Sequence, residues 1–119
     1  MATIRSVADA FVAGKPGYVR GDCPGGAYVT SDVDFFYSYR TEIGARLPVG
    51  LFAVTTHEYS ISTTNHTRKL EQALRDAGYS PGELTVDIET RVPGRHGGYG
   101  SAWHPTGFAT YPFTVWSKV

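Results

Sequence analysis

The segment that most constrains the fold is residues 34–46, where aromatic and β-branched side chains recur at every second position. This period of two predicts a half-buried β-strand, because successive side chains of a strand point to opposite faces. Residues 48–50 (Pro-Val-Gly) favour a turn, and residues 51–56 supply a second strand, so the two are predicted to form an antiparallel hairpin. One face of the first strand would carry Phe35, Tyr37, Tyr39, Thr41 and Ile43.

Two amphipathic helices are predicted from apolar residues at helical spacing. The first is assigned Ser6 as its N-cap and ends at Gly14, and its buried stripe comprises Ile4, Val7, Ala8, Phe11 and Val12. The second is assigned Thr63 or Thr64 as its N-cap and ends at Gly78. Its buried face would hold Leu70, Ala73, Leu74 and Ala77.

The remaining segments predict further strands. Residues 17–32 indicate a loop or loose hairpin, and residues 59–62 would extend the second strand of the predicted hairpin or begin another. Residues 83–91 alternate, with Leu84, Val86 and Ile88 toward the core, and residues 108–119 form a last strand in which Pro112 indicates an edge position or a bulge. We therefore expect a single α+β domain over residues 1–119, with a mostly antiparallel sheet and two helices on one face.

Charge and cysteine content narrow the classes of function. Eleven basic residues balance eleven acidic ones, so overall charge does not favour binding to nucleic acid or a membrane surface. Cys23 is the only cysteine, which excludes an intramolecular disulfide and fits a reducing compartment. The sequence contains no long apolar run, so neither a signal peptide nor a membrane span is predicted. We therefore expect a cytoplasmic protein without membrane partners.

His66 is a candidate functional group at the predicted start of the second helix. Together with Thr63 and Thr64 it would surround an amide-rich helix end, which favours anionic ligands. It would act there as a general base or as part of an anion site. The alternative is a semi-buried histidine that continues the inner face of the helix and forms only local hydrogen bonds.

Two other groups of residues are candidates for binding. Tyr39, Arg40 and Glu42 lie on the first strand, where the two charged groups form either a solvated ionic cluster or a ligand contact. The glycine-rich loop of residues 93–107 lacks the spacing of a phosphate-binding loop, but its Arg95, Tyr99 and Trp103 are residue types that dominate protein interfaces. The four histidines are too widely spaced to predict a metal site, and no cofactor is expected.

Three motifs carry a resemblance to a known family. They are Phe-Val-Ala-Gly-Lys at residues 11–15, Tyr-Ser-Tyr-Arg-Thr-Glu-Ile at residues 37–43 and Tyr-Ser-Ile-Ser-Thr-Thr-Asn-His at residues 59–66. Their order resembles a family of small uncharacterised proteins encoded by tailed bacteriophages, over roughly residues 10–77. The resemblance implies a viral origin, a place in the bacterial host cytoplasm, and a protein that binds and redirects a host or phage component.

These observations favour a small binding protein over an enzyme, with a host or phage protein as its partner. Two alternatives remain open. The first is a nucleic-acid-binding or nucleic-acid-processing module that uses the basic residues Arg40, Arg68, Lys69 and Arg75, with Tyr37 or Tyr59 stacking on bases. The second is a small hydrolase with His66 as its general base.

Overall fold

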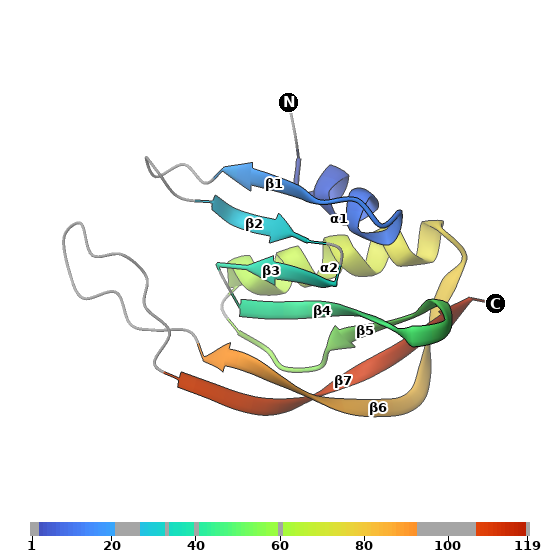
Figure 1. Ribbon diagram of the computed structural model, residues 1–119. Helices are drawn as coiled ribbons and strands as arrows, with labels where there is room; N and C mark the ends of the chain where they lie inside the picture. Colours follow the sequence, from blue (N-terminus) through green and yellow to red (C-terminus); the bar gives the residue numbers. More distant parts are fainter. Residues whose placement is uncertain are drawn as a thin grey trace.

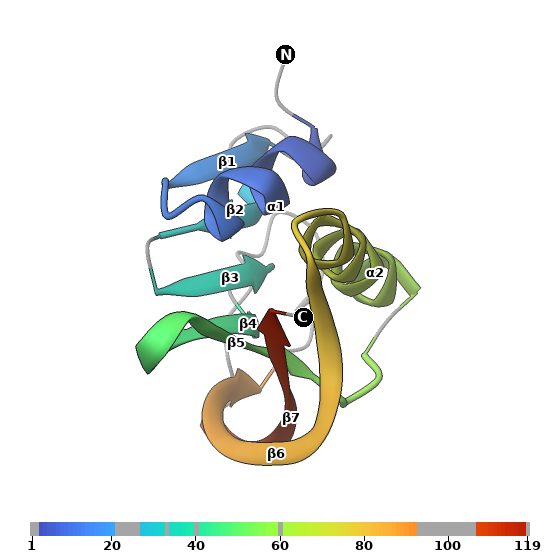
Figure 2. The same cartoon turned by 90° about the vertical axis from the view of Figure 1, so that its right-hand side faces the viewer.

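The structure is a computed structural model of the 119-residue chain, and it describes residues 3–20, 27–32, 34–39, 41–59, 61–92 and 107–118. Within these residues the chain forms two α-helices and one seven-stranded antiparallel sheet, with the strand order β1-β2-β3-β4-β5-β7-β6. The two helices lie on one face of the sheet, which confirms the predicted α+β fold (Figures 1 and 2).

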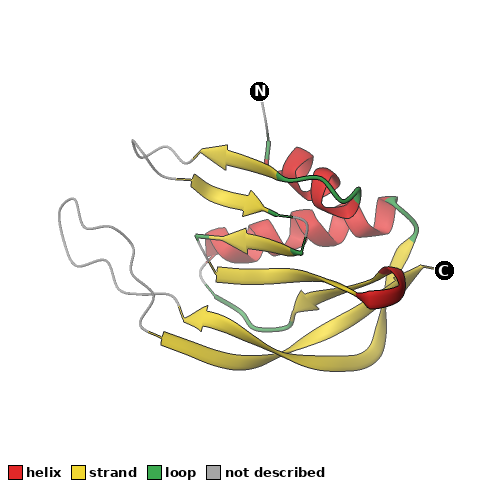
Figure 3. Cartoon of the chain, in the orientation of Figure 1, coloured by secondary structure: helices red, strands yellow, loops and turns green. Residues whose placement is uncertain are grey.

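The elements are distinguished by type in Figure 3. The helices are α1 (Ile4–Val12), a short 3-10 helix (Pro48–Gly50) and α2 (Ile61–Asp76). The strands are β1 (Gly17–Arg20), β2 (Ala27–Ser31), β3 (Phe35–Ser38), β4 (Thr41–Leu47), β5 (Leu51–Thr55), β6 (Tyr79–Val92) and β7 (Gly107–Lys118).

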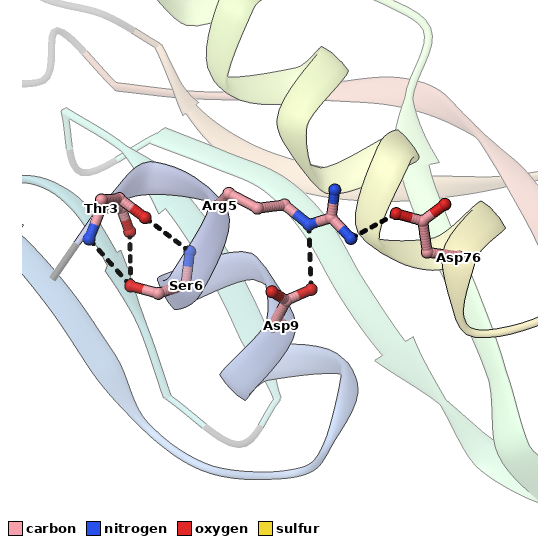
Figure 4. Close-up of polar contacts among 5 residues, drawn as sticks. All are labelled: Thr3, Arg5, Ser6, Asp9 and Asp76. Carbon is pink, nitrogen blue, oxygen red and sulfur yellow. Dashed lines mark hydrogen bonds and ion pairs between the residues drawn. The ribbon is translucent and has the colours of Figure 1, made fainter.

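Helix α1 begins earlier than predicted, because Thr3 and not Ser6 is its N-cap. The two residues form a capping box, in which each side chain accepts a hydrogen bond from the backbone N–H of the other (Figure 4). The sequence signal was therefore real but was assigned to the wrong member of the pair. The predicted stripe is confirmed at Val7, Ala8 and Phe11, which are buried.

The predicted strand over residues 34–46 is wrong in one respect, because it is two strands, β3 and β4, joined by a tight turn. Tyr39 in this turn adopts a left-handed φ of 49°. The aromatic alternation passes through the turn without a glycine or proline, so the sequence pattern gives no sign of the break. The hairpin predicted over residues 34–56 is confirmed for β4 and β5, which pair antiparallel.

A β-bulge in β4 changes which side chains face the helices. Phe36 pairs with Gly44 and Tyr37 pairs with Glu42, so Ile43 is the extra residue between the two pairs. Ile43 is fully buried in the core under the helices, whereas Glu42 points to the opposite face of the sheet. Gly44 lies where α2 packs directly on β4, and a Cβ atom there would overlap Cδ2 of Leu70.

Helix α2 begins at Ile61, so the prediction of Thr63 or Thr64 as its N-cap is wrong, and so is the prediction of a strand over residues 59–62. Both threonines lie inside the first turn of the helix. The Thr67 hydroxyl donates to the Thr63 carbonyl oxygen, a local bond that hydroxyl residues also make within helices. The predicted inner face is confirmed at Leu70, Ala73 and Leu74, which are buried.

Two predictions about the C-terminal strands β6 and β7 are wrong. Leu84 is 75% exposed because the β6–β7 register shifts between Pro81 and Thr85, which turns Leu84 outward. Pro112 lies in a central strand, since β7 pairs with both β5 and β6. The missing N–H is tolerated because the β5–β7 ladder ends at Phe113, and the Pro112 carbonyl oxygen still accepts from both the backbone and the hydroxyl of Thr56.

The sheet has an apolar core on each face. The core under the helices is built around large buried side chains, including Phe11, Phe36, Phe52, Leu70 and Trp116. The second core lies on the other face, where Ala45, Ala53 and Phe113 are covered by half-buried side chains of β3, β4, β6 and β7. Neither described α-helix combines the length and the apolar character that crossing a bilayer requires.

Candidate binding site

Three polar side chains meet where the β3–β4 turn touches the start of α2. The Ser38 hydroxyl lies 2.6 Å from Nδ1 of His66 and donates to Oγ1 of Thr63 at 3.0 Å. Ser38, Thr63 and His66 are 1%, 6% and 3% exposed, so the structure places His66 and Thr63 inside the protein. This arrangement matches the interpretation of His66 as a buried histidine on the inner face of the helix.

The heavy-atom positions link the three side chains, whereas the direction of the bond to His66 depends on the imidazole tautomer. With Nδ1 protonated, His66 donates to the Ser38 oxygen; with Nδ1 unprotonated, it accepts from the Ser38 hydroxyl. Burial lowers the pKa of His66 to about 4, which leaves the imidazole neutral at pH 7. A base that activates serine needs an unprotonated nitrogen facing the hydroxyl, so only the tautomer with an unprotonated Nδ1 could activate Ser38. In either tautomer the contact joins the end of β3 to α2.

Tyr39 forms the outer surface over this buried network. Its ring centroid lies 5.7 Å from that of His66, and the side chain is 40% exposed. Ile61, the first residue of α2, is 83% exposed at the same end of the molecule, where the β3–β4 turn meets the helix (Figure 1). The two side chains place an aromatic ring and a β-branched apolar group in contact with solvent.

Glu42 serves as a contact between two strands that are not neighbours in the sheet. Its carboxylate accepts from the backbone N–H of Arg91 on β6 at 3.1 Å and lies 3.7 Å from Nε of the same residue. The Arg91 guanidinium in turn lies over the Tyr37 ring, 5.9 Å from its centroid. Burial raises the pKa of Glu42 against the lowering effect of Arg91. The carboxylate thus holds the edge strand β6 against the sheet.

A polar cavity of about 210 Å³ lies on the other side of α2. One wall is the connection from β5 to α2, through Thr55, Thr56, His57 and Glu58. The other wall is the helix, through Thr64, Thr67, Arg68 and Glu71. Thr64 is the one sequence-predicted site residue that lines this cavity.

Hydrogen bonds and ring contacts hold the connection in place. The His57 N–H donates to Oγ1 of Thr55 at 3.2 Å, and Oγ1 of Thr56 donates to the Pro112 carbonyl oxygen at 2.8 Å. The His57 ring lies between two tyrosines, with centroids 4.4 Å from Tyr59 and 4.2 Å from Tyr111. This wall of the cavity is therefore formed before any ligand arrives.

The charges that line the cavity are mixed in sign. Glu58 and Glu71 contribute carboxylates and Arg68 contributes a guanidinium. Burial raises the pKa of Glu71, although Arg75 and Arg68 act in the opposite direction. Sequence reasoning missed His57, Arg68 and Glu71 as a group, and the only signal was a Thr-Thr-His-Glu run between a strand and a helix.

A shallower groove of about 400 Å³ lies between the C-terminal ends of the two helices. Its apolar lining comes from Val12, Ala13, Ala73, Ala77 and Tyr79. At its rim Arg5 joins the helices, because its guanidinium pairs with Asp9 at 3.0 Å and with Asp76 at 2.5 Å (Figure 4). Lys118 also lines the groove, with its ammonium 5.8 Å from the centroid of the Tyr79 ring.

Four predicted site residues lie outside the described residues: Arg40, Arg95, Tyr99 and Trp103. Within the described part of the chain, no group of three or more His, Cys, Asp or Glu side chains is arranged to hold a metal ion. The chain matches no protein-family model, no curated protein and no solved structure. The resemblance to a bacteriophage family therefore stays a prediction from the three motifs.

Proposed function

We propose that the protein is a phage-encoded binding protein without catalytic activity that engages a host or phage protein in the bacterial cytoplasm. The proposed contact surface is the end of the molecule where the β3–β4 turn meets the start of α2. The phage origin and the location rest on the resemblance over residues 10–77.

The observation that carries this proposal is the exposure of Tyr39 and Ile61 at that end, where the Tyr39 ring lies over His66 and its hydrogen-bonded partner Ser38. Tyrosine supplies a large rigid contact area with a polar tip, and exposed apolar neighbours add buried area when a partner docks. The underlying Ser38 contacts Thr63 and His66, which ties the residue before Tyr39 to α2. Contacts that order a surface before docking lower the entropy cost of binding.

Affinity capture from host lysate, with and without phage infection, tests this surface. The double variant Tyr39→Asn, Ile61→Ser removes both side chains, and asparagine tolerates the left-handed backbone of position 39. The matched control is Val49→Asn, because Val49 is also left-handed, with φ of 57°, and 92% exposed, but follows the far end of β4.

We expect capture of the same partner by the wild type and the control and at least a tenfold loss for the double variant. Equal capture by all three proteins would remove this surface from the proposal. Nuclease treatment of the lysate separates the two partner classes, because capture that disappears with nuclease would favour the nucleic-acid alternative.

The contact of 2.6 Å between Ser38 and His66 is the observation that favours a hydrolase as the second candidate. Such an enzyme would have to open the Tyr39 turn, because Ser38 is only 1% exposed. A fluorophosphonate probe labels activated serines and provides the test. Labelling of the wild type that disappears in Ser38→Ala would support the hydrolase, and an unlabelled wild type would remove it.

A further inference from the structure

We propose that the cavity between the β5–α2 connection and α2 binds a small zwitterionic molecule of the amino-acid class, with its carboxylate at Arg68 and its ammonium group at Glu71. This site is separate from the surface of Tyr39 and Ile61, and the inference does not depend on the proposed function.

The size of the cavity sets the size of the ligand. Pockets that hold drug-sized molecules occupy roughly 300–1,000 Å³. The cavity measures about 210 Å³, which suits a molecule of only a few heavy atoms. Free amino acids fall in this class, whereas nucleotides and folded peptides do not.

The charges of the lining select a ligand that carries both signs. A simple anion would face the carboxylates of Glu58 and Glu71, and a simple cation would face the guanidinium of Arg68. Arg68 and Glu71 are three residues apart on the helix, so their Cβ atoms lie about 5–6 Å from each other. The adjacent ammonium and carboxylate groups of an amino acid match that pair of neighbouring opposite charges.

Glu71 is a partly buried carboxyl at the wall of the cavity. Burial raises the pKa of this carboxyl even with Arg75 and Arg68 nearby, so the two arginines compensate only part of the lost hydration. An ammonium group in the cavity would supply a charge-assisted hydrogen bond to this carboxylate. The second carboxylate, Glu58, lines the same space from the opposite wall.

Two hydroxyl groups of the cavity lining, those of Thr56 and Thr67, add hydrogen-bond acceptors. Thr56 Oγ1 already donates to the Pro112 carbonyl oxygen, and Thr67 Oγ1 already donates to the Thr63 carbonyl oxygen. Each hydroxyl has one hydrogen, so both present only acceptor lone pairs to a ligand. An ammonium group has three donors and no acceptor, so it complements these two hydroxyl oxygens and the two carboxylates of the lining.

The test is a titration of the purified full-length chain, followed by NMR or calorimetry, with the twenty amino acids as probes. Ethylamine, propionate and glycerol serve as ligands that carry only the cation, only the anion or neither. We expect at least one amino acid to saturate the site, and all three partial analogues to bind at least tenfold more weakly. No saturation by any amino acid, or equal binding of an analogue, would overturn the inference.

Variants locate the binding in this cavity. Arg68→Gln and Glu71→Gln should each weaken the binding of the amino acid at least tenfold. Lys69→Gln is the matched control, because it removes the same charge from the same helix at an exposed position that does not line the cavity. Thermal unfolding of each variant checks that it is folded. Unchanged affinity in Arg68→Gln, or an equal loss in Lys69→Gln, would contradict the assignment.

Discussion

The inner flank and the cavity flank of α2 carry similar polar side chains in different surroundings. Thr63 and His66 face the sheet and are hydrogen-bonded inside the protein, whereas Thr64 and Arg68 line a cavity. Neighbouring positions on a helix differ in direction by about 100°, which is enough to separate Thr63 from Thr64 completely. A polar run at a helix start therefore contains both groups that are buried in the protein and groups that line a cavity.

The largest contrast is expected between truncations on the two flanks. Leu70→Ala should lower the free energy of unfolding by about 3 kcal/mol, because it removes a fully buried side chain and leaves a cavity. Arg68→Ala on the cavity flank should cost less than about 0.5 kcal/mol, as is usual for surface positions. Urea unfolding of both variants measures the difference, and similar losses would erase the distinction between the flanks.

A pH series tests whether His66 belongs to the interior. Its pKa is about 4 in the folded protein and 6.5 for an exposed imidazole, so between these values only the unfolded chain binds the proton. Stability should therefore fall as the pH drops from 6.5 to 4, with a total contribution of about 3 kcal/mol.

The variant His66→Gln isolates this contribution. Glu42 and Glu71 have raised pKa values and act with the opposite sign, but they are present in both proteins and cancel in the difference. The stability advantage of the wild type over His66→Gln should shrink between pH 7 and pH 4, as followed by chemical denaturation. A constant advantage would mean that the imidazole is accessible to protons.

Gly44 tests how tightly the inner flank packs on the sheet. A Cβ atom there would overlap Leu70 and approach Phe36, so Gly44→Ala should cost about 1–3 kcal/mol through overpacking. Gly17→Ala is the control, because its Cβ would meet Val7 and Ala10 only at ordinary contact distances. Thermal melting points of the two variants measure the effect. Equal shifts would show that α2 can move away from β4 at little cost in stability.

The smallest effect separates the adjacent threonines. Thr63→Val removes the acceptor of the Ser38 hydrogen bond and should cost about 1 kcal/mol, since a buried polar group loses its partner. Thr64→Val keeps the shape of the side chain at the cavity and should change stability by less than about 0.5 kcal/mol. Urea denaturation measures the free energy of unfolding of both variants. A larger loss for Thr64→Val than for Thr63→Val would contradict the prediction.

Much of the fold could be predicted from local patterns. Apolar spacing identified both helices, and alternation identified the β4–β5 hairpin and the C-terminal strands, because these signals act over a few neighbouring residues. The features that the sequence did not predict depend on long-range pairing or lack a recognisable turn residue. The β3–β4 turn carries Tyr39 in a left-handed conformation without a turn residue, and the bulge at Ile43 is defined only by pairing with β3.

The candidate site was less predictable than the fold. Thr63, Thr64 and His66 were chosen as one group, but the start of α2 at Ile61 turned them to different sides of the helix. Glu42, a predicted binding residue, accepts a hydrogen bond from the backbone N–H of Arg91, a contact that spans 49 residues of sequence. His57 gains its position from Tyr59 and Tyr111, and the second of these comes from the last strand.

Local patterns were sufficient to predict the fold class, the two helices and most of each apolar face, since hydrophobic periodicity and helix-stop residues are local properties of the chain. Which polar side chains became internal, and which line a cavity, followed from the packing of distant segments. That outcome depends on strand pairing, on the bulge in β4 and on the angular position of each residue when α2 packs on the sheet. Each of these is set by contacts between distant segments, which a local sequence pattern does not predict.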